Sequence, residues 1–205
     1  MKVKYLRILP LPLIFLLSYL IIDSINSEIT FQKEAKIRID QNVQKLKDLR
    51  LLQVAYKKTN NEFCDNFDTL MNFYFNDSLH IVKAEGETPD SLTDKQALEM
   101  GIISRDTSYV SVRETLFDEV YKKTRNNSFP IDENNMTKIP FTDIDYNIDA
   151  GVVNKGNVNV QVFEISATYK NVLFGLDAKN KKYDLEKLLK VGSMNEASLN
   201  GNWGE

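Results

Sequence analysis

The feature that most restricts how this chain folds is a helical pattern near its start that changes character twice. It begins as an apolar run over residues 8–22, which holds no charged side chain. From Glu28 it continues as a charged pattern, and it finishes near Tyr56 among residues that are mostly apolar. A helix that is apolar on all sides is surrounded by lipid or protein, whereas a charged one meets water. The pattern therefore predicts one long helix that passes through three environments.

The apolar run has the composition of a membrane span but is short. At 1.5 Å per residue, residues 8–22 rise about 22 Å, whereas the hydrocarbon core of a bilayer is about 30 Å thick. Starting the helix at Tyr5 lengthens it to about 27 Å. We therefore expect residues 8–22 to be a transmembrane signal anchor with these side chains facing lipid: Ile8, Leu13, Phe15, Leu17, Leu20 and Ile22.

The residues on either side of the run indicate whether it is kept or cleaved and which way it crosses the membrane. A basic start followed by an apolar run is also the pattern of a cleaved signal peptide, which is the alternative. Retention is favoured because isoleucine stands where a cleavage site needs a small residue. Lys2, Lys4 and Arg7 precede the run. By the positive-inside rule, residues 1–7 are then cytoplasmic, and the rest lies beyond the inner membrane, in the periplasm.

A narrow apolar stripe follows on the charged part of the helix. Ala35, Ile39, Val43 and Leu46 lie within about 80° of one another at 100° per residue. The stripe predicts that residues 23–48 form an exposed amphipathic stalk. Its four residues are expected to make a coiled-coil contact with a partner helix, either a neighbouring copy of this chain or another single-span membrane protein.

Residues 49–205 are expected to fold as one periplasmic head. Residues 49–56 are apolar around nearly the whole helix, so the helix enters the head as its core. Short helical patterns come next, and from about residue 139 strand patterns follow. Over residues 158–168 the alternation changes phase, which predicts a bulge or a strand covered on both faces. The expected fold class is α+β: a long N-terminal membrane and stalk helix packed into a head with short helices and an antiparallel sheet.

Charge is distributed unevenly along the chain, although the net charge is only −3. Between residues 28 and 58, eight Lys/Arg stand against four Asp/Glu, whereas residues 59–205 carry 15 basic and 24 acidic side chains. An acidic head is poorly suited to nucleic acid, whose phosphates bind basic surfaces. We therefore expect the lipid bilayer as a partner, and no nucleic acid.

The sequence carries no motif of a catalytic or metal site. It has no glycine-rich phosphate loop and no nucleophile elbow. Cys64 and His80 are each the only residue of their type, which excludes an internal disulfide and a two-histidine metal site. The acidic pairs at residues 132–133 and 143–145 lack the spacing of an EF-hand and are interpreted as surface charge. We expect a non-enzymatic protein without a metal or other cofactor.

A resemblance to a known family rests on residues 46–73, which read LKDLRLLQVAYKKTNNEFCDNFDTLMNF. The segment resembles the end of the long helix in type IV pilins and type II secretion pseudopilins, where an Asn-containing turn precedes an aromatic residue and a short helix. The prepilin cleavage motif is missing, because the apolar run has neither glycine nor glutamate. The whole chain also resembles uncharacterised single-span envelope proteins of Bacteroidota. The resemblance implies a structural or assembly component of a pilus-like or secretion apparatus.

A membrane-anchored periplasmic ligand-binding or sensory domain is the alternative function. Such a domain needs a pocket in the head and little self-association. A structural component instead needs a surface that neighbours can contact.

Overall fold

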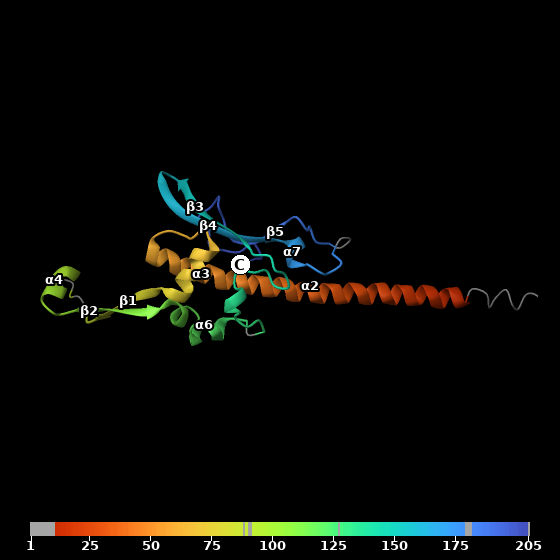
Figure 1. The fold of residues 1–205 in the computed structure, drawn as a ribbon, viewed down its shortest axis with the longest axis horizontal. Coiled ribbons are helices and arrows are strands. Elements are labelled where there is room, and N and C mark those ends of the chain that lie inside the picture. Colours follow the sequence, from red (N-terminus) through yellow and green to blue (C-terminus); the bar gives the residue numbers. More distant parts are fainter. Residues whose placement is uncertain (1–10, 88, 90–91, 127, 179–181, 205) are drawn as a thin grey trace, which may run out of the picture.

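The computed structural model describes residues 11–87, 89, 92–126, 128–178 and 182–204. One helix, α2 (Leu11–Asn60), is the axis around which the other elements lie. Its first part protrudes alone, and its second part is enclosed by the head (Figure 1). Short helices and antiparallel sheets make up the head, so the expected α+β class is confirmed.

Short helical segments pack around the enclosed part of α2. In α3 (Phe67–Asn76), the side chain of Asn66 caps the helix by accepting hydrogen bonds from backbone N–H groups of the first turn. α5 (Val112–Leu116), α6 (Glu119–Thr124) and a single 3-10 turn, η1 (Glu133–Asn135), follow later in the chain. The apolar residues of α3 and α5 join the same core as α2.

A three-stranded antiparallel sheet lies along the other side of α2. It has the order β3 (Asn147–Lys155), β4 (Val158–Thr168) and β5 (Leu188–Gly192), with a single helical turn, α7 (Tyr169–Val172), after β4. Gly156 and Asn157 have positive φ, which is the conformation of a two-residue turn between antiparallel strands.

The middle strand accounts for the change of phase in the sequence pattern. The register of β3 and β4 runs without a bulge. Val162 is 2% exposed and Phe163 is 0% exposed, although neighbouring residues of a strand point to opposite faces. β4 is therefore covered on both faces, which was one of the two predicted alternatives.

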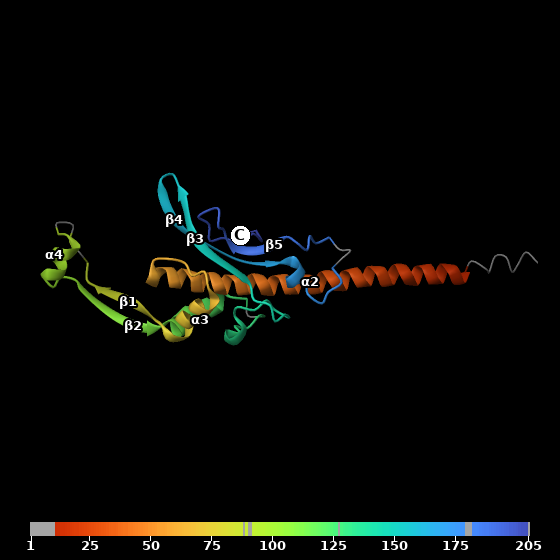
Figure 2. The same cartoon turned by 45° about the horizontal axis from the view of Figure 1, so that its top comes forward.

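A second, two-stranded sheet forms an arm that extends past the C-terminal end of α2. The arm consists of β1 (Ser78–Glu85), α4 (Asp94–Glu99) and β2 (Ser104–Ser111), with β1 and β2 antiparallel and α4 at the tip. It points away from the protruding part of α2 in both views (Figures 1 and 2). Most of its described residues are exposed, so the arm is largely separate from the core.

The boundary between stalk and head differs from the prediction. The head begins to cover α2 at Phe31, which is 7% exposed and meets the ring of Tyr183 edge-on with 6.1 Å between ring centroids. From Phe31 onward the head therefore covers one face of α2, and an exposed stalk over residues 23–48 is wrong. The reason is that segments far along the chain reach down α2, and the helical pattern itself contains no sign of them.

The head also buries the stripe of four residues that was predicted to contact a partner helix. Ala35 and Leu46 are fully buried, and Ile39 and Val43 pack against the same core. The head's own residues thus occupy the surface that was predicted to meet a partner helix. The prediction of a partner contact at these four residues is corrected accordingly.

Replacement of Gly192 tests the packing of β5 against β4. Gly192 has φ +77°, and an added Cβ would overlap the carbonyl oxygen of Phe163. We expect Gly192→Ala to lower the free energy of unfolding by more than about 2 kcal/mol, because the left-handed conformation alone costs about 1–2 kcal/mol. Thermal unfolding of the full chain in detergent measures the loss.

Gly156→Ala is the matched control, since Gly156 has φ +59° with nothing within 4 Å of its Cβ position. This variant is expected to lose only the conformational cost of about 1–2 kcal/mol. Equal losses in the two variants would contradict the close contact between Gly192 and β4.

Candidate functional site

The protruding segment of α2, residues 12–30, is the first functional feature. Its large apolar side chains are exposed, and the predicted anchor residues among them are Leu13, Phe15, Leu17, Leu20 and Ile22, between 50% and 73% exposed. Within the described chain, α2 is the one helix long and apolar enough to cross a membrane. The remaining predicted anchor and topology residues, Ile8, Lys2, Lys4 and Arg7, lie outside the described residues.

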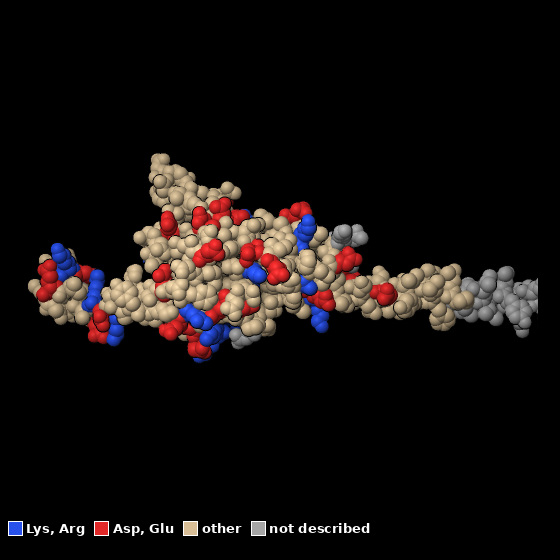
Figure 3. Space-filling model, viewed as in Figure 1, with Lys and Arg blue, Asp and Glu red and all other residues tan. Residues whose placement is uncertain are grey.

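Charge is nearly absent from this segment. Asp23 is the only charged residue between Leu11 and Ser27. In Figure 3 the protruding part is accordingly almost without Lys, Arg, Asp or Glu, whereas the head carries both signs.

The junction between the protruding segment and the head is continuous helix. Neither glycine nor proline occurs from Leu13 to Asn60, so nothing in the sequence breaks or kinks α2. The buried half of the same helix lies at the centre of the head's core. The orientation of the head is therefore fixed relative to the protruding segment.

Buried polar side chains of α2 hold the irregular segments of the head. The Asn42 side-chain oxygen accepts a 2.5 Å hydrogen bond from the Tyr146 hydroxyl. Gln53 donates to the carbonyl of Cys64 at 2.7 Å and accepts from its N–H at 3.0 Å. Asn42 and Gln53 are both fully buried. Because unpaired buried polar groups are costly, these amides fix the path of segments that lack a sheet or helix partner.

Asp48 is the centre of a buried charged network. Its carboxylate accepts hydrogen bonds from Arg125 Nε at 3.0 Å, Arg125 Nη2 at 2.7 Å, the Tyr121 hydroxyl at 2.7 Å and Gln44 Nε2 at 3.0 Å. The side chains of Arg125 and Asp48 are 5% and 4% exposed. Burial and the neighbouring Asp48 carboxylate raise the pKa of Tyr121. The loss of solvation is thus offset by several hydrogen bonds to one carboxylate.

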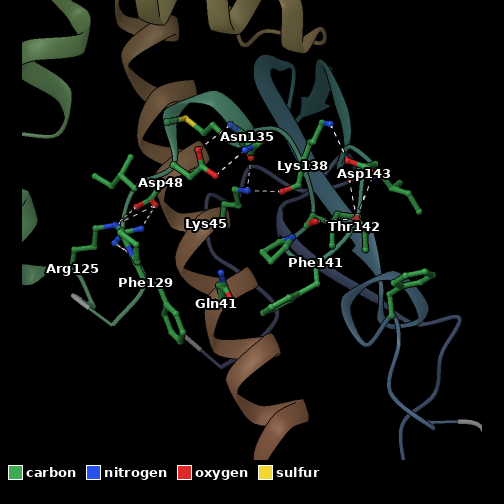
Figure 4. Close-up of a pocket in the computed structure, with 18 residues that line it drawn as sticks. Gln41, Lys45, Asp48, Arg125, Phe129, Asn135, Lys138, Phe141, Thr142 and Asp143 are labelled. Atoms are coloured by element: carbon green, nitrogen blue, oxygen red, sulfur yellow. Dashed lines mark hydrogen bonds and ion pairs between the residues drawn. The ribbon is translucent and has the colours of Figure 1, made fainter.

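Beside this network, a cleft of about 650 Å³ opens against α2. Gln41, Lys45 and Asp48 of α2 line it, and loops around residues 129–132 and 138–144 form its walls (Figure 4). Many wall residues are apolar: Phe129, Pro130, Pro140, Phe141, Ile144 and Phe174. Its volume is within the range of small-molecule sites.

Arg38 ties two of these wall residues to α2. Its guanidinium lies 4.3 Å from the centroid of the Phe141 ring and donates a hydrogen bond to the carbonyl of Phe174. Phe141 has a positive φ of 66° and is 59% exposed. A cation over an aromatic face is a favourable contact. It holds the Phe141 ring at the edge of the cleft.

Lys45 lies partly buried in the cleft and has a lowered pKa. Its ammonium donates to the carbonyl of Asn135 and, at 2.6 Å, to that of Lys138. Burial lowers its pKa from the usual 10.5 to about 8, although the carboxylates of Asp132, Asp48 and Asp145 act in the opposite direction. Lys45 therefore fastens one wall of the cleft to α2, and the cleft presents both apolar surface and hydrogen-bonding groups.

Of the other residues singled out in the sequence, Asp132 and Asp143 line the cleft, whereas Cys64 and His80 lie elsewhere. Among the described residues, no three of His, Cys, Asp and Glu come together in a way that could hold a metal ion. Cys64 is buried in the core. His80 is exposed on the arm, 6.4 Å between ring centroids from Tyr109. Asp145 accepts a 2.6 Å hydrogen bond from the Thr137 hydroxyl.

Sequence reasoning missed the roles of Lys45 and Arg125. Lys45 bonds to groups 90 and 93 residues away, and Arg125 lies 77 residues from Asp48. Contacts over such separations leave no periodic pattern in the chain. The one available signal was the charge density of the helix, which was interpreted as a solvated face.

Comparison with known proteins identifies no similar protein. No model of a known protein family matches the chain, and no curated protein or solved structure is similar to it at a significant level.

Replacement of Lys45 tests its part in holding the cleft wall. Lys45→Met removes the ammonium that donates to two carbonyl groups, and we expect the free energy of unfolding to fall by about 1–3 kcal/mol. Lys36→Met is the matched control, because Lys36 is exposed on the same helix and should change stability little. Thermal unfolding of both variants beside the wild-type chain gives the comparison.

The pH dependence of this loss gives a second readout. The pKa of Lys45 is about 8 in the folded chain, below its usual 10.5, so the folded state binds fewer protons between these values. Wild type should therefore gain stability relative to Lys45→Met as pH rises from 8 to 10.5. A constant difference across this window would show that the Lys45 pKa is not lowered.

Proposed function

We propose that this chain is a non-enzymatic, single-span membrane protein that holds a periplasmic head in a fixed orientation above the inner membrane. The N-terminus would lie in the cytoplasm. Its role would be structural, as a subunit or assembly component of a pilus-like or secretion apparatus in the cell envelope. The single observation that carries the proposal is the unbroken helix that joins an exposed apolar segment to the centre of the head.

The arm supports a role in assembly. It extends from the end of the head that is distant from the protruding segment (Figure 1). Large apolar side chains are exposed on it, among them Leu98, Met100, Ile102 and Tyr109, between 43% and 75%. A two-stranded ribbon is only marginally stable alone, and its open edges can pair with another chain. The anchor and the arm thus give the molecule two separate ends.

Charged substitutions in the protruding segment test the anchor. Leu17→Arg with Leu20→Arg should release the chain from membranes, because each arginine near the centre of a span costs about 3 kcal/mol. The matched control is Ser27→Arg with Thr30→Arg, on the same exposed helix but nearer the head. Alkaline carbonate extraction of membranes, followed by immunoblotting, measures retention. Retention of the first variant at the wild-type level would refute the proposed anchor.

A second candidate function, a membrane-anchored ligand-binding or sensory domain, is favoured by the cleft. The cleft combines apolar walls with the polar side chains of Gln41 and Lys45, as small-molecule sites do. With this function, the rigid helix would hold a ligand-binding domain near the membrane rather than a structural subunit of an apparatus. The two functions differ in whether the cleft is occupied.

Filling the cleft distinguishes them. We expect a small-molecule fraction of periplasmic extract to raise the melting temperature of wild type if the cleft binds a ligand. Gln41→Phe places a ring in the cleft and should abolish this rise, whereas Gln32→Phe, on the exposed part of the same helix, should keep it. If no fraction raises the melting temperature, or if Gln41→Phe responds like wild type, ligand binding in the cleft is refuted.

A further inference from the structure

We propose that two copies of this chain associate in parallel through an isoleucine stripe on α2, formed by Ser18, Ile22, Ile25 and Ile29. The inference rests on the proposed function, because it requires the protruding segment to stand in a membrane. It assigns the lateral contact to a surface nearer the membrane than the one predicted from the sequence.

The stripe has the spacing of a coiled coil. Its residues are separated by four, three and four positions, and at 100° per residue they lie within about 60° of one another. Ile22, Ile25 and Ile29 are 58%, 54% and 61% exposed. Ser18 is also exposed, and a small residue allows two helices to approach closely within lipid. One apolar face therefore runs continuously from the apolar run toward the head.

A lipid environment does not suit Ile25 and Ile29, the two stripe residues nearer the head. Apart from its two isoleucines, the segment from Asp23 to Thr30 consists of Asp, Ser, Asn, Glu and Thr residues. Immersing Ile25 and Ile29 in hydrocarbon would also immerse Asp23, because α2 is straight and unbroken here. A second helix can cover the isoleucines while the polar residues stay in water. A protein surface fits this face better than a bilayer does.

The described residues of the head leave this side of α2 open. Phe31 and Ala35, where the head first covers the helix, lie roughly 130° around the helix from the stripe. Beyond the start of the head, the same face of α2 carries Gln32, Lys36 and Asp40, and all three are exposed. A second α2 can therefore lie along the stripe without meeting the part of the head that the structure describes over these turns.

Geometry and charge both favour a second copy as the occupant. Copies anchored in one membrane run in the same direction and hold the same residue at the same height. A two-fold axis along the membrane normal then brings each stripe residue opposite its equivalent, as at the core positions of a parallel coiled coil. In that arrangement Glu28 and Lys33 occupy the flanking positions, so Glu28 of one copy approaches Lys33 of the other with opposite charge.

Disulfide crosslinking of the full chain in native membranes tests the contact. In a Cys64→Ala background, which removes the only native thiol, single cysteines replace Ile25 or Ile29 on the stripe. The matched controls are Ser27→Cys and Thr30→Cys, which lie on other faces of the same exposed turns. After mild oxidation, Ile25→Cys and Ile29→Cys should give a band at twice the chain mass, and the controls should give none.

Three results would overturn the proposal. Crosslinking of the controls as strongly as the stripe variants would indicate random collision, and a band at another mass would indicate a different partner protein. Absence of any band would indicate that the stripe does not meet a second copy. Carbonate extraction of the same membranes separates the two proposals, because a retained chain that gives no dimer refutes only the self-association.

A charge substitution gives an independent readout that does not depend on thiol chemistry. Ile25→Asp with Ile29→Asp should abolish co-purification of two differently tagged copies in detergent, because it places like charges in the contact. Ser27→Asp with Thr30→Asp adds the same charge on other faces and should leave co-purification intact. All four positions are exposed, so the head should melt at the wild-type temperature in both variants. Unchanged co-purification of the stripe variant would contradict the inference.

Discussion

The head depends on hydrogen bonds between buried polar side chains of α2 and chain segments that have no regular partner. Asn42, Lys45 and Asp48 bond to groups 104, 93 and 77 residues away. Gln53 bonds to Cys64, 11 residues away, and both Asn42 and Gln53 are fully buried. Apolar burial brings these segments to α2, but it does not decide where each one lies. The polar contacts decide this, since a shifted segment would leave buried donors and acceptors unpaired.

This arrangement lets one helix hold both an apolar segment that is long enough to span a membrane and the core of the head. The buried half of α2 is held on several sides, by the sheet, the short helices and the loops around the cleft. Before Phe31 the residues of α2 whose exposure is described are exposed, apart from the partly covered Glu28. Because no glycine or proline interrupts the helix between them, any constraint on the apolar segment orients the head and, beyond it, the arm.

Much of the secondary structure followed from local chemistry. The apolar run was expected to be helical and is, from Leu11 onward. The expected antiparallel sheet also forms, but its first strand begins at Asn147, because residues 139–146, where strand was predicted to start, form a loop with only an isolated bridge. The same local reasoning failed over residues 31–48. There a charged helix with a narrow apolar stripe was interpreted as an exposed stalk, although Asp48 and Gln44 are buried. The sequence does not reveal whether a polar side chain forms its hydrogen bonds with water or with a distant arginine.

The sequence by itself determined the long helix, its apolar start and the α+β character of the head. These depend on periodicity, composition and turn residues, which act over a few positions of the chain. Only the tertiary structure decided where the head begins, which face of α2 it covers and how the cleft forms beside Lys45. These depend on contacts such as that of Arg125 with Asp48, 77 residues apart, and folding brings such groups together without any local pattern to announce it.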